Sequence, residues 1–297
     1  MKVIFIPPIF RQYSLSLLLV LSIITCSNGQ ELKLQQLLEK EVIGFKGEVG
    51  IYVLNLASGE EAGIQADSIF PTASIVKVPI LIGVFDKIEK GELEQDQKLL
   101  YRDSIRYGGS GLMQFFKDSV ETNLSILMSL MITYSDNTTS LWCQDLAGGG
   151  SQINTLLSGL GFEKTRVNSR TPGREKNWEQ YGWGQTSPRE MAMLLVKIRK
   201  GEVISPTASE QMYRLMTNNY YGNYALSSIP AHIQTASKQG MVAASKSELV
   251  MVNGPSGDYV FYIATKNNED QRWAEDNQGY ELQRKISTLL WNYFEGK

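Results

Sequence analysis

The chain has 297 residues, of which 20% are charged, and its net charge is -2. This length allows one large domain or two smaller ones with a sizeable core, and a nearly neutral chain without a long basic run gives no reason to expect nucleic acid as a partner. The single histidine, His232, is accompanied by neither a Gly-x-Ser-x-Gly elbow nor a cysteine cluster. This argues against a Ser-His-Asp hydrolase and against a zinc site, so we expect no metal and no cofactor.

Residues 1–29 are predicted to be an export signal. Basic residues precede a nearly uncharged stretch at residues 13–26 that is too short to span a bilayer as a mature helix. Two processing routes stay open. Ser27-Asn28-Gly29 suits ordinary cleavage, whereas Ile23-Ile24-Thr25-Cys26 resembles a bacterial lipoprotein box that would place a lipid anchor on Cys26. Either route predicts an exported protein, periplasmic or lipid-anchored in the bacterial envelope.

After the signal, a helix and a pair of strands are followed by several helices. Leucines at helical spacing predict a helix over residues 31–41, and alternating β-branched residues predict a strand over 47–56 that turns into a second strand near 62–65. The helices predicted next cover residues 74–90, 122–131, 137–146 and 151–160.

Residues 166–187 show no clear periodicity. Their glycines and prolines, together with Trp178 and Trp183, favour a packed Ω-type loop. A helix then begins, with Ser187 as its N-cap, Pro188 in the first turn and Glu190 closing a capping box.

The C-terminal part returns to strands. Residues 248–253 and 259–265 are predicted strands joined as a hairpin, and 273–294 form an amphipathic helix. The fold class is therefore α/β, more narrowly α+β: one antiparallel sheet flanked by the terminal helices, plus an all-helical lobe. Residues 30–297 would form a single catalytic domain with a cleft between its lobes. The sheet lobe takes residues 30–73 and 216–297, and the helical lobe takes 74–215.

Three short motifs carry the candidate chemistry. Ser74-x-x-Lys77 opens an apolar helix, Ser135-Asp136-Asn137 lies between two helices, and Lys238-Gln239-Gly240 lies where a strand begins. A serine and a lysine three residues apart share one helix face, which lets the amine act as the base for the hydroxyl. Each motif alone has an ordinary structural explanation: a helix cap, a capping turn and a solvated lysine at a strand edge.

In this order the motifs resemble those of class A serine β-lactamases and penicillin-binding proteins, over roughly residues 30–297. We expect Ser74 to be the nucleophile and Lys77 its base, with a pKa lowered by burial or by a nearby cation. Ser135 would relay a proton to the leaving nitrogen, and Asp136 would orient its loop through backbone hydrogen bonds.

The remaining candidates would bind substrate. Lys238 would supply the nearby cation and hold a substrate carboxylate, on the same strand as Gly240, and Asn137 would contact a substrate amide. The resemblance implies an oxyanion hole made of the backbone N–H groups of Ser74 and Met241.

Two features depart from the class A pattern. If Arg170 corresponds to the family's loop arginine, Thr171 and Pro172 stand where a deacylating glutamate should fall. The nearest carboxylates, Glu175 and Glu179, are candidates for that role or plain surface charges. Gln239 replaces the usual Thr or Ser of Lys-x-Gly, and strand alternation predicts that its side chain points away from Lys238.

Three hypotheses follow for the function. The first is a class A β-lactamase-like serine hydrolase that opens β-lactam amides through a Ser74 acyl-enzyme. The second is a peptidoglycan D,D-peptidase or penicillin-binding protein with slow deacylation, and the third is a non-catalytic envelope binding protein that keeps the fold. The expected partner is a small β-lactam or a peptidoglycan-like substrate, and we expect a monomer.

Overall fold

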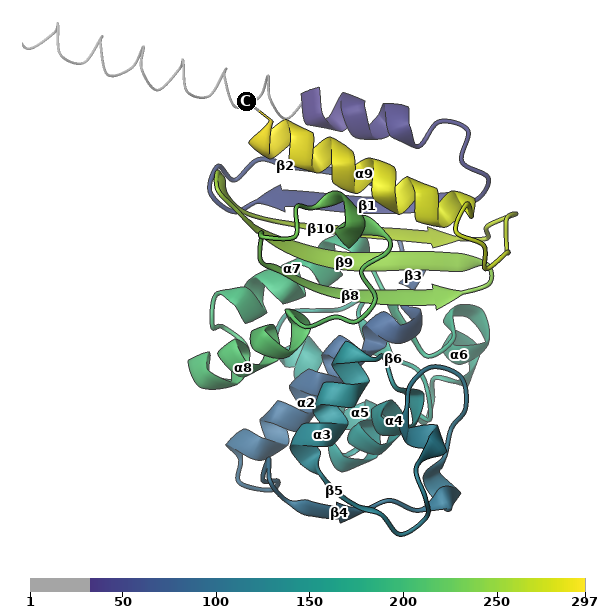
Figure 1. The fold of residues 1–297 in the computed structure, drawn as a ribbon, viewed down its shortest axis with the longest axis vertical. Coiled ribbons are helices and arrows are strands. Elements are labelled where there is room, and N and C mark those ends of the chain that lie inside the picture. The colour runs from purple at the N-terminus through teal and green to yellow at the C-terminus, as the bar shows by residue number, and fades with distance from the viewer. Residues whose placement is uncertain (1–32, 297) are drawn as a thin grey trace, which may run out of the picture.

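The two ends of the described chain meet in one antiparallel sheet (Figure 1). The structure, a computed structural model, describes residues 33–296, so the predicted export signal and the lipid-anchor candidate Cys26 lie outside the described residues. The sheet has five strands in the order β2-β1-β10-β9-β8. Its strands are β1 (Glu48–Asn55), β2 (Glu61–Ile64), β8 (Thr235–Val242), β9 (Ser245–Gly254) and β10 (Gly257–Lys266). The prediction of a single antiparallel sheet built from both ends is confirmed.

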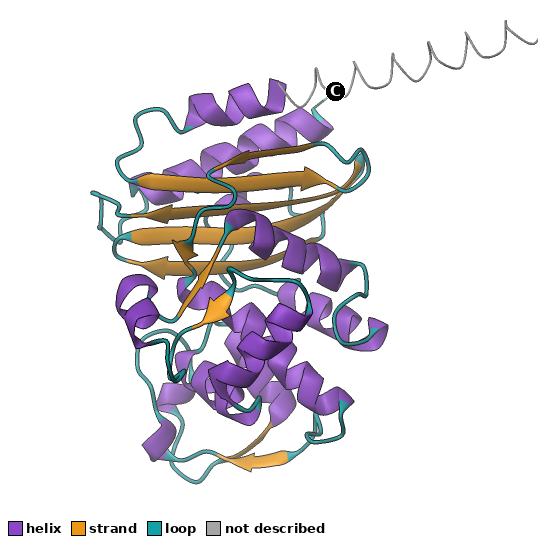
Figure 2. Ribbon diagram, turned by 180° about the vertical axis from the view of Figure 1, so that it is seen from behind, coloured by secondary structure: helices purple, strands orange, loops and turns teal. Residues whose placement is uncertain are grey.

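Period-two alternation sends the side chains of each strand into two different cores. Ile51 and Phe261 belong to the core beneath the helix of residues 33–41 and α9 (Gln278–Glu295), so the terminal helices flank the sheet as expected. Tyr52 and Tyr262 point to the opposite face and belong to the core shared with the helices of the other layer. On that face α7 (Pro188–Arg199) packs against β1, β9 and β10, and Figure 2 shows the same layers from behind.

The helical layer lies below the sheet in Figure 1. Besides α7, its helices are α2 (Lys77–Glu89), α3 (Leu124–Thr133), α4 (Asn137–Leu146), α5 (Gly149–Gly159), α6 (Glu175–Tyr181) and α8 (Pro206–Met216). Two small sheets brace it: β3 (Phe70–Pro71), β7 (Gly184–Thr186) and β6 (Arg166–Val167) in one, β4 (Lys98–Leu100) and β5 (Glu121–Asn123) in the other. No helix among the described residues is long and apolar enough to cross a membrane.

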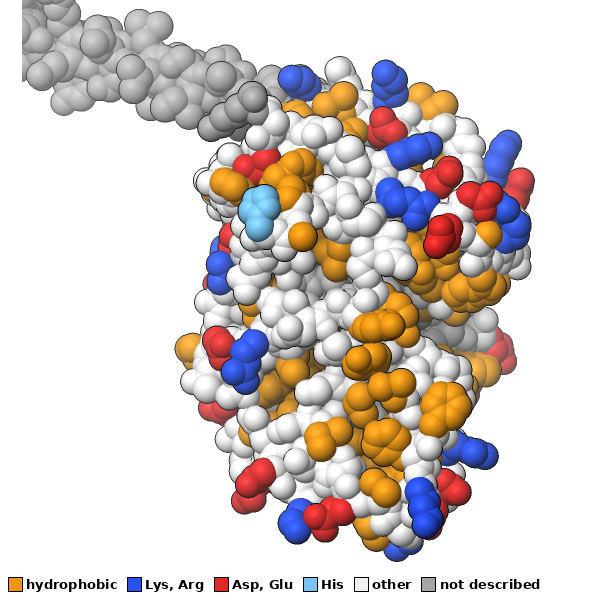
Figure 3. All heavy atoms as spheres, viewed as in Figure 1, with side chains coloured by type: hydrophobic (Ala, Val, Ile, Leu, Met, Phe, Trp, Pro, Cys, Tyr) orange, Lys and Arg blue, Asp and Glu red, His pale blue; other side chains and the backbone are white. Residues whose placement is uncertain are grey.

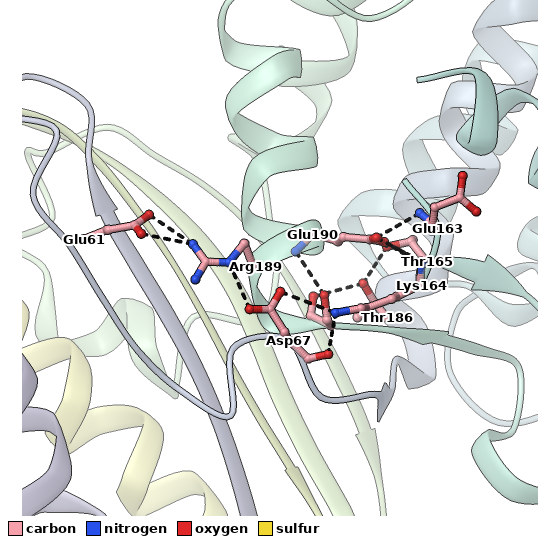
Figure 4. Close-up of polar contacts among 9 residues, drawn as sticks. Glu61, Asp67, Glu163, Lys164, Thr165, Thr186, Arg189 and Glu190 are labelled. Carbon is pink, nitrogen blue, oxygen red and sulfur yellow. Dashed lines mark hydrogen bonds and ion pairs between the residues drawn. The ribbon is translucent and has the colours of Figure 1, made fainter. Parts of the chain in front are cut away.

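The N-terminus of α7 confirms one half of the predicted capping box and contradicts the other. The Ser187 hydroxyl accepts the Glu190 N–H at 3.3 Å, so Ser187 is the N-cap. The Glu190 carboxylate does not reach back to the cap residue. The carboxylate instead accepts three backbone N–H groups of the turn before β6, which have no strand partner. They belong to Glu163, Lys164 and Thr165 (Figure 4).

Two other expectations need correction. Residues 166–187 do contain regular structure, because α6 and the strands β6 and β7 lie within them. The C-terminal helix begins at Gln278 rather than at residue 273, since Asn277 caps it by accepting the Gly279 N–H at 2.9 Å. A short polar side chain that satisfies a free N–H group fixes the start of a helix more firmly than apolar spacing does.

Candidate active site

Ser74 lies in a 3-10 turn, Ala73–Val76, that leads directly into α2. The apolar run that follows is buried and fixes α2 in the core, whereas Ser74 itself is partly exposed. It lines a cavity of about 520 Å³ and also a second one of about 380 Å³. Thr72, not Ser74, stands at the cap position of the turn. Helix capping therefore does not explain the serine, which faces open space at the end of a rigid element.

The Lys77 amine is fully buried and surrounded by acceptors. Its Nζ lies 2.9 Å from Ser74 Oγ, 2.5 Å from the Ser135 carbonyl oxygen, 3.1 Å from Ser135 Oγ and 2.9 Å from Asn137 Oδ1. An ammonium has three N–H groups, so four acceptors compete for them. The amine is thus within direct proton-transfer distance of the candidate nucleophile.

Burial and charge together favour the neutral form of this lysine. Burial lowers the pKa of Lys77 well below its usual range, and the neighbouring Lys238 cation lowers it further, while Asp136 opposes both effects. A lysine that gives up its proton this readily can accept one from a serine hydroxyl. The sequence-based expectation of a lowered pKa at Lys77 agrees with this environment.

Ser135 links the two buried lysines. Its Oγ lies 3.1 Å from Lys77 Nζ and 3.0 Å from Lys238 Nζ. The residue has φ = 53°, in the left-handed region that costs a non-glycine residue free energy. This backbone turn brings both the carbonyl oxygen and the hydroxyl of one residue to Lys77. The strain is compensated by these hydrogen bonds to a buried amine.

Asp136 and Asn137 hold the loop that carries Ser135. Asp136 Oδ1 accepts the Thr139 N–H at 2.9 Å and caps α4, and Oδ2 accepts the N–H groups of Leu112 and Met113 at 2.6 and 2.7 Å. The predicted orienting role of Asp136 is confirmed. Asn137 accepts from Lys77, and its amide group also lines both cavities beside Ser74.

Lys238 projects from β8 toward Ser135 and is completely buried. Burial lowers the pKa of Lys238 to about 7, against the opposing effect of the Glu248 carboxylate on β9. The prediction that Gln239 points away from this lysine is wrong. Gln239 Oε1 lies 3.4 Å from Lys238 Nζ, because β8 is the edge strand and the side chain bends around that edge.

Gly240 allows β8 to approach the turn that carries Ser74. A Cβ atom at this position would lie 2.2 Å from the Thr72 carbonyl oxygen, so any other residue would push the strand away. The next residue, Met241, lines both cavities together with Ser74. The close approach therefore places the two predicted oxyanion-hole residues on the walls of the same cavities.

The two loop glutamates lie elsewhere. Glu175 and Glu179 are exposed and line a separate cavity of about 620 Å³, and Glu175 accepts the Gly173 N–H at 3.0 Å. No carboxylate of the described chain lines either cavity that contains Ser74. Nor do the described residues group histidine, cysteine or carboxylate side chains that could hold a metal ion.

Two aromatic residues belong to the site although no motif marks them. Tyr107 and Trp183 form an edge-to-face pair with centroids 5.3 Å apart and line both the largest Ser74 cavity and the cavity of the loop glutamates. The Trp183 ring also lies 5.8 Å from Lys77 Nζ. Trp183 stood out in the sequence only as part of an aromatic, glycine-rich segment, and Tyr107 gave no signal because its neighbours are loop residues.

Comparison with known proteins agrees with this arrangement. A model of the Beta-lactamase enzyme family matches residues 32–294. The chain is 22% identical over 300 residues to Beta-lactamase VEB-1 of Pseudomonas aeruginosa, covering 97% of this chain and 99% of that protein. The structure of PBP-A has a TM-score of 0.79 and 28% identity, with 89% of this chain and 97% of that one covered. A mutant of PBP-A in an acyl-enzyme complex with penicillin G has a TM-score of 0.78, 27% identity and coverage of 91% and 97%.

Proposed function

The chain belongs to the beta-lactamase enzyme family, and on that premise we propose that it is a serine enzyme that opens β-lactam amides through a Ser74 acyl-enzyme and releases the acyl group slowly. The observation that carries this proposal is the contact of Ser74 Oγ with the buried Lys77 amine at 2.9 Å. A hydroxyl becomes a nucleophile at neutral pH when such a base adjoins it.

The acylation step uses Ser74, Lys77 and Ser135 in turn. Ser74 Oγ attacks the lactam carbonyl carbon while its proton passes to neutral Lys77 Nζ. The backbone N–H groups of Ser74 and Met241 stabilise the oxyanion. When the C–N bond breaks, the Ser135 hydroxyl gives its proton to the ring nitrogen and regains one from Lys77. The position of Ser135 Oγ between the two lysine amines supports this relay.

Slow release is proposed because hydrolysis of the ester needs an activated water. In class A enzymes a glutamate in the Ω loop provides that activation, and here the described residues that line the Ser74 cavities include no carboxylate. Without a positioned base, general-base catalysis worth about 10² to 10⁴ in rate is lost from this step.

A peptidoglycan D,D-peptidase is the second candidate function. The observation that favours it is the 28% identity to PBP-A together with the penicillin G acyl-enzyme of a PBP-A mutant. Such an enzyme shares the acylation half of the cycle and would hold a β-lactam as a long-lived ester. Either function fits a monomer in the bacterial envelope, and the N-terminal sequence predicts export to the periplasm or an anchor at Cys26.

Two measurements on one set of proteins test the proposal. Intact-protein mass spectrometry after exposure to penicillin G should show a stable adduct on the wild type, and nitrocefin turnover should be slow. Ser74→Ala should lose the adduct and the turnover. Ser104→Ala, which alters an exposed serine in another 3-10 turn, should keep both.

The outcomes separate the hypotheses. Rapid turnover that Ser74→Ala abolishes would contradict slow release and select an efficient β-lactamase. Neither adduct nor hydrolysis in the wild type would end the acylation proposal. An adduct that persists in Ser74→Ala would exclude Ser74 as the nucleophile.

A further inference from the structure

Gln239, and not Lys238, forms part of the wall of the smaller Ser74 cavity. Gln239 lines this cavity together with Ser74, Ser135 and Met241. Lys238 lines neither of the Ser74 cavities, and its side chain is fully buried behind them. A substrate group that enters this cavity therefore meets a neutral carboxamide where the motif would offer a cation.

The hydrogen bonds of Lys238 are already taken within the chain. Its Nζ lies 3.0 Å from Ser135 Oγ, 3.0 Å from the Gln239 carbonyl oxygen and 3.4 Å from Gln239 Oε1. These three acceptors match the three N–H groups of an ammonium. A substrate carboxylate could bind Lys238 only by displacing one of these acceptors, and Gln239 Oε1 makes the longest of the three contacts.

Asn219 holds that carboxamide in place. Its Nδ2 donates to Gln239 Oε1 at 2.7 Å and to Ser237 Oγ at 2.9 Å. Both acceptors lie on β8, whereas Asn219 lies in the loop that follows α8. Moving Gln239 aside therefore breaks at least one hydrogen bond in a buried environment, which costs about 1–3 kcal/mol.

The described residues around the cavities supply no replacement cation. Lys266 lines the larger cavity, but its Nζ donates to the Ile69 carbonyl oxygen and pairs with Glu48 at 3.2 Å. Lys246 lies behind the rim residue Trp273, and its Nζ donates to the Val242 and Ala243 carbonyl oxygens. Figure 3 shows apolar side chains gathered below the sheet and most charged side chains nearer the edges of this view.

We propose that Gln239 is a specificity-determining residue that closes the carboxylate-binding position of the site, so that the preferred substrates carry an uncharged amide or ester group there. The proposal rests on Ser74 acylation. Its physical basis is that a carboxylate brought into this cavity loses its hydration without gaining a charged partner. A neutral group that donates a hydrogen bond to Gln239 Oε1, or that packs on Tyr221, Tyr224 and Trp273, does not carry that cost.

The test compares penicillin G with its methyl ester, in which one methyl group replaces the negative charge at this position. Acylation rates are followed by intact-protein mass spectrometry. For the wild type we expect the ester to react at least as fast as the acid. In Gln239→Thr the acid should gain about tenfold, the value of one charge-assisted hydrogen bond, while the ester changes by less than about twofold.

Two further variants complete the design. Gln234→Thr makes the same change at an exposed glutamine just before β8 and should leave the acid-to-ester ratio unchanged. Asn219→Ala releases Gln239 without altering it and should shift the ratio toward the acid by a smaller amount. Asn219→Ala also keeps the test valid if Gln239→Thr folds poorly.

The results distinguish this inference from the function on which it rests. If the wild type reacts with the acid tenfold faster than with the ester, or if neither Gln239→Thr nor Asn219→Ala moves the ratio, the role of Gln239 is excluded while Ser74 acylation stands. If neither compound forms an adduct with any variant, acylation itself is excluded and this inference falls with it.

Discussion

Two neighbouring regions of the molecule treat their polar groups in opposite ways. In the amine cluster, defined as Ser74, Lys77, Ser135 and Lys238, two buried lysines converge on one serine hydroxyl. In the loop segment 166–187 the carboxylates are exposed, and the partly buried Arg174 is used to tie the loop together.

The amine cluster lowers the stability of the folded chain, whereas the loop segment does not. Burying an amine disfavours its charged form, and a second amine nearby adds repulsion. Local structure gives no reason for such an arrangement, because apolar side chains of similar size would pack there with less cost. The loop segment carries no comparable cost, since its charged groups are either solvated or paired. Under the proposed mechanism, the buried polar groups serve acylation, and the loop segment supplies no buried carboxylate for hydrolysis of the acyl-enzyme.

The largest expected effect comes from removing one amine of the cluster. Lys77→Met keeps the side-chain volume but deletes the base, so we expect acylation by nitrocefin to slow about a thousandfold. The melting temperature should change little, because removing an amine buried beside another cation offsets the hydrogen bonds that Ser135 and Asn137 lose. Rapid-mixing absorbance measures the first quantity and calorimetry the second.

The matched control lies on the same helix. Lys87→Met changes a lysine whose Nζ pairs with Glu92 at 2.6 Å near the end of α2, and it should leave acylation unchanged. If Lys77→Met acylates within about tenfold of the wild type, the amine is not the base and the contrast between the two regions loses its functional meaning.

The next effect concerns Glu248, a buried carboxylate whose charge acts on Lys238 of the amine cluster. Glu248 is fully buried on β9, opposite Gln239 in the strand register. Its Oε2 accepts the Ala225 N–H at 2.7 Å, and its Oε1 has no hydrogen-bond partner among the described residues. Burial raises the pKa of Glu248 from 4.5 to about 7, against the Ala225 N–H and Lys238. Between pH 4.5 and about pH 7, Glu248 binds more protons in the folded state than in the unfolded state, so the free energy of unfolding falls as pH rises.

Glu248→Gln removes that titration and keeps an acceptor for Ala225. We expect it to raise the free energy of unfolding by about 2–3 kcal/mol at pH 8 and by much less at pH 5. The lowered pKa of Lys238 has the opposite effect. Above about pH 7 this lysine binds more protons in the unfolded state than in the folded state, so the free energy of unfolding should still rise with pH in the variant. Urea unfolding at several pH values measures both. Glu269→Gln, at an exposed position, is the control, and an equal gain at pH 5 and pH 8 would contradict the argument.

The elements that sequence could predict are those whose signal is local. Alternation at residues 47–56 predicted β1, and the motif order predicted that Ser74, Ser135 and Lys238 would converge. The first prediction holds because strand burial depends on neighbouring residues. The second holds because the motifs resemble those of a known family, since Lys77 and Ser135 are 58 residues apart and Ser135 and Lys238 are 103 apart. The helix α8 escaped notice although Ser205 caps it by accepting the Ala208 N–H at 3.2 Å.

The failures involve partners that lie far apart in sequence. The direction of Gln239 depends on Asn219 and on the edge position of β8, and neither can be read from Lys-x-Gly itself. The capping-box pattern is local and predicts that the Glu190 carboxylate binds the start of its own helix. The carboxylate instead binds a turn more than twenty residues upstream. Long-range polar contacts of this kind leave no periodicity in the chain.

A smaller effect is expected when the loop segment is loosened. The Arg174 side chain donates to Asn168 Oδ1 at 2.7 Å and to Gln185 Oε1 at 2.8 Å. Arg174→Ala should lower the free energy of unfolding by about 1–2 kcal/mol and change the acylation rate by less than about twofold. The exposed Lys176→Ala serves as control in urea unfolding. An acylation loss of tenfold or more would show that the loop supports the amine cluster after all.

The smallest effect should come from the loop carboxylates. Neither Glu175 nor Glu179 lines a cavity that contains Ser74, and the pair Tyr107 and Trp183 lies on the wall shared by the two cavities. Glu175→Gln and Glu179→Gln, singly and together, should therefore change the decay of the penicillin G adduct by less than about twofold, against the 10² or more lost with a true general base. Glu175→Gln keeps an oxygen that can accept the Gly173 N–H, so it changes charge without releasing the turn. Adduct mass followed over time measures the decay. If either variant slows it tenfold or more, that carboxylate reaches the acyl-enzyme, and the loop segment takes part in the second half of the cycle.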